Sequence, residues 1–243
     1  MFRLLLLPAV GAVAAADAPV VNVPGQGVAL GVYDPICDGV EIFFGLPYAR
    51  PPVGALRWRE PQPLSAWPNA TAAHPFNATA FGARCMQDAA IPTLVPMAMS
   101  EDCLFLNVHA PKGAAAAAAG APASRPVMLW IHGGSYTTGE SNDYTGDTLV
   151  AASQGTTCAL PSSAAPASPP APPSAPERPA AAADSSVVVV TINYRLNAFG
   201  FLGSRHLAAE EGAAGTGNYG IADQVLSRDL LLQCFLVFLL THD

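Results

Sequence analysis

The sequence predicts an α/β fold that is built on a mostly parallel central sheet. Two continuous apolar runs, residues 127–131 (VMLWI) and 187–193 (VVVVTIN), are typical of strands that are covered on both faces. A short helix is expected between them at residues 147–153. The first run ends abruptly in His132-Gly-Gly, which is how a buried strand delivers a glycine loop to the rim of a sheet.

The remaining elements follow in chain order. Residues 20–44 indicate short strands that are separated by turns such as Pro24-Gly25 and Asp38-Gly39. Residues 45–67 contain several prolines and are expected to be irregular. Residues 102–108 are a further strand candidate. Residues 217–240 are expected to begin as a glycine loop and to continue as a helix.

The composition excludes several classes of function. Of the 243 residues, 51% are hydrophobic and 12% are charged, and the net charge is -7. The sequence contains no basic patch, so nucleic-acid binding is not expected. It contains neither HExxH nor paired CxxC motifs, so no metal is expected. The glycines of residues 212–217 are in the wrong order for a dinucleotide fingerprint, and no cofactor is expected.

The N-terminus predicts secretion. Residues 1–16 combine an early cation, Arg3, with an apolar run and small residues before the expected cleavage site, as signal peptides do. A buried N-terminal strand or helix is the alternative. The run is shorter than the roughly 20 residues of a spanning helix, so no stable membrane anchor is expected. In a secreted chain, Asn69 and Asn77 begin usable glycosylation sequons.

An oxidising compartment would also favour disulfides among the five cysteines, although the odd number leaves at least one thiol free or intermolecular.

Two segments are interpreted as insertions. Residues 113–124 are mostly alanine, and residues 156–186 are rich in Pro, Ala and Ser. Such composition buries too little surface to offset the entropy of ordering, which favours a disordered, partly polyproline surface loop. A rigid proline spacer or a ligand for a proline-binding module is the alternative.

Five segments, in order, resemble the type-B carboxylesterases, a family of the α/β-hydrolase fold that includes cholinesterases and fungal lipases. They are GLPYARPPVGALRWREPQPLSAW (45–67), SEDCLFLNVHAP (100–111), VMLWIHGGSYTTGESNDYTG (127–146), VVVVTINYRLNAFGFLG (187–203) and GNYGIADQ (217–224). The resemblance implies that residues 17–224 are the N-terminal part of this fold. It also implies a carboxylic-ester hydrolase that acts on a small-molecule ester through a serine acyl-enzyme.

The resemblance implies roles for individual residues. Gly134 and Ser135 match the positions whose backbone N–H groups form two arms of an oxyanion hole; a tight strand-exit turn is the structural alternative. It also implies a disulfide and two structural ion pairs, which join Cys85 to Cys103, Arg57 to Glu101 and Arg195 to Asp223. The loop between Cys85 and Cys103 lacks the tryptophan with which cholinesterases bind quaternary ammonium, so a choline ester is not expected.

The catalytic residues of the family are missing from this sequence. The G-x-S-x-G nucleophile motif does not occur, and Gly139-Glu-Ser141-Asn-Asp143 is a decoy that ends in aspartate. None of the five histidines has an evident role as general base, and His132 is expected to brace the glycine loop. The sequence therefore indicates an incomplete fragment. A non-catalytic, neuroligin-like binding relative and a non-functional truncated product are the alternatives.

Residues 225–243 form a divergent apolar tail in which residues 230–240 lack helical periodicity. A buried core helix, a wrong reading frame or an intron would explain it, and an origin outside the true coding sequence is favoured. In the family, the strand at 127–131 lies between the strand at 187–193 and the nucleophile strand. Without that neighbour, VMLWI is an exposed apolar edge, and we expect the chain alone not to fold stably.

Overall fold

A computed structural model describes residues 18–88, 97–114, 125–159, 186–211 and 216–240, without the side chains of 211 and 233–240. The predicted signal peptide and most of both predicted insertions lie outside these residues. The elements, in chain order, are β1 (Val20–Val23), β2 (Gly27–Leu30), β3 (Val32–Tyr33), β4 (Val40–Pro47), the 3-10 helix η1 (Gly54–Leu56), β5 (Phe76–Asn77), β6 (Arg84–Cys85), β7 (Met99–Ser100), β8 (Phe105–Pro111), β9 (Val127–Ile131), the 3-10 helix η2 (Ser141–Asp143), α2 (Asp147–Gln154), β10 (Val188–Ile192), α3 (Asn197–Phe201), α4 (Arg205–Glu211) and α5 (Tyr219–Leu240).

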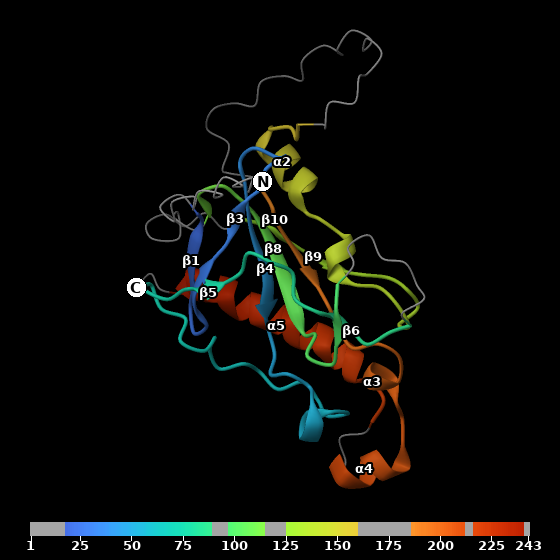
Figure 1. Ribbon diagram of the computed structural model, residues 1–243. Coiled ribbons are helices and arrows are strands. Elements are labelled where there is room, and N and C mark those ends of the chain that lie inside the picture. The colour runs from blue at the N-terminus through green and yellow to red at the C-terminus, as the bar shows by residue number, and fades with distance from the viewer. Residues whose placement is uncertain (1–17, 89–96, 115–124, 160–185, 212–215, 241–243) are drawn as a thin grey trace, which may run out of the picture.

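The main sheet has the strand order β3-β4-β8-β10-β9 (Figure 1). Strands β9 and β10 run parallel and in register, so that Val127 faces Val188 and Ile131 faces Ile192. The other neighbours in this sheet are antiparallel. The sheet is therefore mixed, and its described strands contain one parallel pair. Two small sheets, β1-β2-β5 and β6-β7, flank it.

Helices cover the two faces of β10. On one face, Val189 packs in a core cluster with Val150 and Ala151 of α2. On the other face, Val190 and Ile192 belong to the larger core cluster, against which leucines of α5 pack. Figure 1 shows α5 running along the sheet. All five residues of β10 are buried, as the continuous apolar run predicts, because successive side chains of a strand point to opposite covered faces.

One strand is displaced from its predicted bounds, and the helix predicted within residues 217–240 is present. The strand expected at residues 102–108 is displaced toward the C-terminus, because Cys103 is held in a disulfide and pairing with β4 begins where Phe105 meets Pro47. Helix α5 begins at Tyr219 and continues without a break to Leu240, despite the missing periodicity of its last turns. Among the described helices, none has the combination of length and apolar character that a bilayer-spanning segment needs.

A second disulfide joins Cys37 to Cys158, a pairing that the sequence leaves open. Residues 156–159 and Ser186 are the described parts of the predicted loop at 156–186. Cys158 forms a β-bridge with Cys37, and Ser186 is 2% exposed. The two ends of this segment are thus attached to the core more firmly than its composition predicts.

Candidate functional site

The glycine loop that leaves β9, residues 132–139, turns through backbone conformations that most residues avoid. The φ angle is 111° at Gly134, 55° at Ser135 and 60° at Tyr136. A Cβ atom added to Gly134 would lie 2.0 Å from the carbonyl oxygen of Thr138, so only glycine fits there. The group that leaves no room for a side chain at Gly134 is therefore the Thr138 carbonyl, which belongs to the same loop.

Two backbone N–H groups of this loop have no acceptor among the residues that the structure describes. The Gly134 carbonyl accepts hydrogen bonds from the amides of Thr137, at 3.0 Å, and Thr138, at 3.1 Å. By contrast, no acceptor for the N–H of Gly134 or Ser135 is found in the described part of the chain, and both residues are exposed. Successive N–H groups in such a turn form a donor arrangement that suits an anion.

His132 fixes the start of this loop. It is 3% exposed, and its ring stacks on that of Tyr194 with the centroids 4.4 Å apart. Its Nδ1 bonds the Gly133 carbonyl at 2.9 Å, so Nδ1 carries the proton. The hydroxyl of Tyr194 donates to the His132 carbonyl at 2.9 Å. Burial lowers the pKa of His132, with a smaller opposing effect of the Gly133 hydrogen bond. These contacts fit a bracing side chain that is neutral near pH 7.

The segment after β10 supports the outer part of the loop. The backbone N–H of Asn197 donates to the Tyr136 carbonyl at 2.9 Å. Its side-chain amide donates to the Thr137 carbonyl at 2.7 Å. Asn197 itself has a φ of 51°, a conformation that asparagine tolerates better than most residues. A shallow, open hollow lies beside these contacts, and Ser135, Phe201 and Leu202 contribute to its lining.

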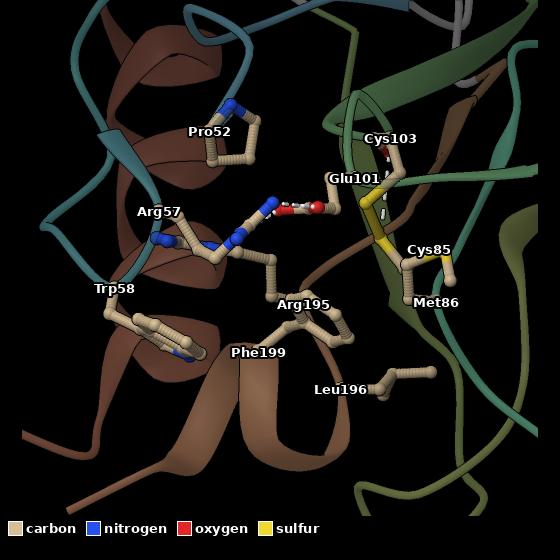
Figure 2. A pocket seen from close by; sticks show the side chains of 10 residues that line it. All are labelled: Pro52, Arg57, Trp58, Cys85, Met86, Glu101, Cys103, Arg195, Leu196 and Phe199. Atoms are coloured by element: carbon tan, nitrogen blue, oxygen red, sulfur yellow. Dashed lines mark hydrogen bonds and ion pairs between the residues drawn. A yellow bond between two sulfur atoms is a disulfide. The ribbon is translucent and has the colours of Figure 1, made fainter. Parts of the chain in front are cut away.

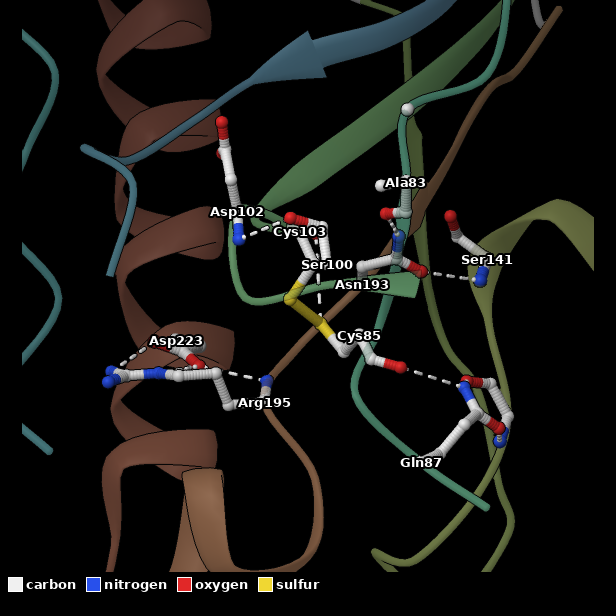
Figure 3. Close-up of a disulfide and its surroundings, with 12 residues drawn as sticks. Ala83, Cys85, Gln87, Ser100, Asp102, Cys103, Ser141, Asn193, Arg195 and Asp223 are labelled. Carbon is white, nitrogen blue, oxygen red and sulfur yellow. Dashed lines mark hydrogen bonds and ion pairs between the residues drawn. A yellow bond between two sulfur atoms is a disulfide. The ribbon is translucent and has the colours of Figure 1, made fainter. Parts of the chain in front are cut away.

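The disulfide that the resemblance implies, Cys85–Cys103, is present (Figure 3). Both cysteines are buried, at 2% and 1% exposure. The bond joins β6 to the segment before β8. In Figure 3, Gln87 extends from the Cys85 side of this bond toward the segment that carries Ser141.

Arg195 and Asp223 form a buried ion pair between the end of β10 and α5. The Arg195 side chain donates to both carboxylate oxygens of Asp223, at 2.9 and 2.8 Å, and its backbone N–H donates to one of them at 3.0 Å. Burial raises the pKa of Asp223, while the hydrogen bonds from Arg195 oppose that rise. A third guanidinium contact reaches the Arg59 carbonyl. The pair thus ties α5 to the sheet.

Arg57 and Glu101 form the second expected pair, a bidentate contact near the surface (Figure 2). Their side chains are 40% and 21% exposed. The side-chain hydrogen bonding to Glu101 raises the pKa of Arg57, and desolvation of the guanidinium opposes that rise. Trp58, which also lines the small pocket of Figure 2, donates its ring N–H to the Ala198 carbonyl. Arg57, Glu101 and Arg195 line this small pocket, and each of them is engaged in one of the two ion pairs.

Ser141 does not have the surroundings of a nucleophile. It is 1% exposed, and its hydroxyl lies within hydrogen-bond distance of Asn142 and Asn107. Its backbone N–H donates to the side chain of Asn193 at 2.8 Å. This buried amide network, which the sequence did not predict, joins η2 to β8 and β10. Both asparagines of the sequons, Asn69 and Asn77, are exposed. No cluster of metal-ligating side chains occurs within the described ranges.

The model of the carboxylesterase family matches residues 17–229, slightly beyond the last motif at Gln224. The cocaine esterase of Oryctolagus cuniculus is 34% identical over 200 residues, which cover 77% of this chain and 28% of that protein. The neuroligin-like protein glit-1 of Caenorhabditis elegans is 30% identical over 205 residues, covering 82% of this chain and 22% of that protein.

A crystal structure of Aspergillus niger EstA superimposes with a TM-score of 0.63 at 28% identity, covering 92% of this chain and 34% of the other. The fold is thus that of the α/β-hydrolase esterases, as the sequence motifs predict. The chain belongs to the carboxylesterase family, and it spans about a third or less of the length of these relatives.

Proposed function

We propose that the protein that contains this chain is a carboxylic-ester hydrolase that acts through a serine acyl-enzyme. The observation that carries the proposal is the pair of backbone N–H groups at the exposed residues Gly134 and Ser135, for which no acceptor is found among the described residues. Attack of a serine on an ester carbonyl places negative charge on the carbonyl oxygen. Two amides that are already fixed in position stabilise that charge without reorganising during the reaction.

The printed sequence supplies this donor arrangement and not the reacting side chains. It contains no G-x-S-x-G motif, and Ser141 is buried in an amide network. In relatives that are about three times as long, there is room for the nucleophile, an acidic residue and a histidine outside the matched region. We place the third oxyanion donor there as well, on the residue after the nucleophile.

The first test is to sequence the transcript through and past the codon for Gln224. An in-frame helix followed by G-x-S-x-G, and later by an acidic residue and histidine, is the expected result. The product of that transcript should hydrolyse simple p-nitrophenyl esters. A transcript that ends at Asp243 would overturn the hydrolase proposal.

The second test removes the donor geometry from that product. Gly134→Ala places a Cβ against the Thr138 carbonyl and distorts the loop, and we expect kcat/KM to fall about 10²–10³-fold. Gly133→Ala is the comparison variant, because its added Cβ would meet no atom within 4 Å. Equal losses in the two variants would show that the conformation of Gly134 has no special role.

A binding protein is the second candidate, and the match to neuroligin-like protein glit-1 favours it. Such a relative would keep the fold and the ion pairs without hydrolysing esters. A full-length product that lacks G-x-S-x-G and is inert toward p-nitrophenyl esters would support it.

We also propose that the protein is secreted and carries glycans on Asn69 and Asn77. Both asparagines are exposed, and two disulfides are compatible with an oxidising compartment. Expression in a secreting eukaryotic host, followed by removal of N-glycans, should reduce the apparent mass in two steps. Each step should disappear with one of the variants Asn69→Gln and Asn77→Gln.

A further inference from the structure

The two ends of the glycine loop touch each other. Gly139, at the end of the loop, has a φ of 113°. A Cβ on it would lie 2.4 Å from Nδ1 of His132 and 2.6 Å from the Gly133 carbonyl oxygen. Atoms in such close packing cannot shift independently. The position of Gly139 therefore helps to set the position of Gly133, which precedes the exposed donors.

A single side chain holds both backbone polar groups of Gly139. The Gln87 amide nitrogen donates to the Gly139 carbonyl at 2.9 Å, and the Gln87 amide oxygen accepts the Gly139 N–H at 2.9 Å. The same nitrogen also bonds the Cys85 carbonyl at 3.2 Å. Glutamine suits this position because one amide supplies both a donor and an acceptor.

The backbone segment that carries Gln87 is held in place by a disulfide. Gln87 follows Cys85 by two residues, and the Cys85–Cys103 disulfide ties that segment to the start of β8 (Figure 3). Next to Gly139, the fully buried Glu140 lies 3.6 Å from a guanidinium nitrogen of Arg84, on the other side of the cysteine. Two neighbouring contacts thus join the disulfide segment to the end of the glycine loop.

We propose that Gln87 is a positioning residue that holds Gly139 and, through it, the backbone donors of Gly134 and Ser135. The value of those donors as an oxyanion hole rests on the proposed function, whereas the positioning itself does not. The disulfide influences the loop through the same side chain.

The test is amide hydrogen exchange, measured by NMR on the full-length protein that contains this chain. Protection at Gly139 reports the bond to Gln87. Protection at Thr137 and Thr138 reports the shape of the loop, because these amides bond the Gly134 carbonyl and not Gln87. Gln87→Met keeps the length of the side chain and removes its hydrogen bonds. We expect exchange at all three amides to accelerate about tenfold, the equivalent of one to two hydrogen bonds.

Gln62→Met is the matched control, because Gln62 is exposed and its side chain bonds only the nearby Glu60 carbonyl among the described residues. It should leave all three amides unchanged. An effect of Gln87→Met on Gly139 alone would show a local contact and overturn the proposal. Absence of protection at Gly139 in the unmodified chain would overturn it as well.

Gln87→Glu adds a rescue. Its carboxylate cannot donate to the Gly139 carbonyl at pH 7, whereas the protonated acid near pH 4 can. Protection at Thr137 and Thr138 should therefore recover on acidification, when it is expressed relative to the unmodified chain at the same pH. The unmodified chain has the same Arg84, Glu140 and His132 beside the loop, so it corrects for any effect of pH on those groups. If Gln87→Met unfolds the chain, the buried Val190 amide also loses protection. In that case the positioning role is tested by Gln87→Glu at pH 7 and pH 4. Failure to recover would contradict the positioning role.

The measurement involves neither an ester nor a nucleophile, so its outcome is separate from that of the hydrolase proposal. Loss of loop protection in an esterase-inactive protein would retain the positioning role and reject the hydrolase. Hydrolysis that is sensitive to Gly134→Ala and unaffected by Gln87→Met, with unchanged amide exchange, would retain the hydrolase and reject the positioning role.

Discussion

Strands β9 and β10 are parallel neighbours of similar sequence, and they have opposite environments. Every residue of β10 is buried, whereas Met128, Trp130 and Ile131 of β9 are 49%, 47% and 42% exposed. The difference is one of position. Strand β10 lies between β8 and β9 and under two helices, whereas β9 is the last strand of the described sheet. An apolar run thus identifies a strand without fixing how much of it is buried.

The largest expected effect is at the end of β10. Asp223→Asn leaves the Arg195 guanidinium buried without its counter-charge, and we expect the free energy of unfolding to fall by about 3–5 kcal/mol. Glu101→Gln, in the exposed pair, is the matched control and should cost much less. Urea unfolding followed by circular dichroism measures both. Similar losses of unfolding free energy in the two variants would contradict the expected difference between the buried pair and the exposed pair.

The next effect compares two isoleucines that face each other across the strands. Ile192 of β10 is fully buried, and its register partner Ile131 of β9 is 42% exposed. Ile192→Ala should lower the free energy of unfolding by about 2–5 kcal/mol. Ile131→Ala should change it by about 0.5 kcal/mol or less. The same urea experiment applies, and equal losses would mean that β9 is covered in solution.

A smaller, pH-dependent effect is expected at His132, where the chain returns from the exposed β9 to buried surroundings. Burial lowers the pKa of His132, so the unfolded chain binds the proton more readily than the folded one. The corresponding stability is present above the ordinary pKa of about 6.5 and decreases as pH falls below it. Urea midpoints at pH 7.5 and 5.5 should differ less in His132→Gln than in the unmodified chain. An identical difference in both would reject this linkage.

The smallest effect on stability is expected on the open face of β9. Trp130→Lys should change the free energy of unfolding by about 0.5 kcal/mol or less, since the side chain is half exposed. It should nevertheless reduce self-association, because a lysine on an edge strand discourages pairing with another chain. Light scattering at increasing concentration measures this. A monomeric, cooperatively melting unmodified chain would contradict the aggregation hazard at this edge.

The sequence alone determined the strands and the glycine loop, because apolar runs and positive-φ glycines are local properties. It also determined the family, and with it the expected partners Cys85–Cys103, Arg57–Glu101 and Arg195–Asp223, all of which meet in the structure. The burial of β10 followed from its uninterrupted apolar run. The same kind of run also predicted that β9 is covered on both faces, and that prediction was wrong, because β9 is the last strand of the described sheet and most of its residues are exposed or half-buried. Its place at the edge followed from the expected sheet order.

Only the tertiary structure decided the contacts between distant segments that carry no local signal. The Cys37–Cys158 bond joins residues 121 apart in sequence, and an odd set of cysteines permits many pairings. The amide network around Ser141 and the grip of Gln87 on Gly139 likewise depend on where separate segments meet. The sequence around a glutamine does not show whether its side chain lies on the surface or hydrogen-bonds a distant glycine. Only the packed fold distinguishes these two cases.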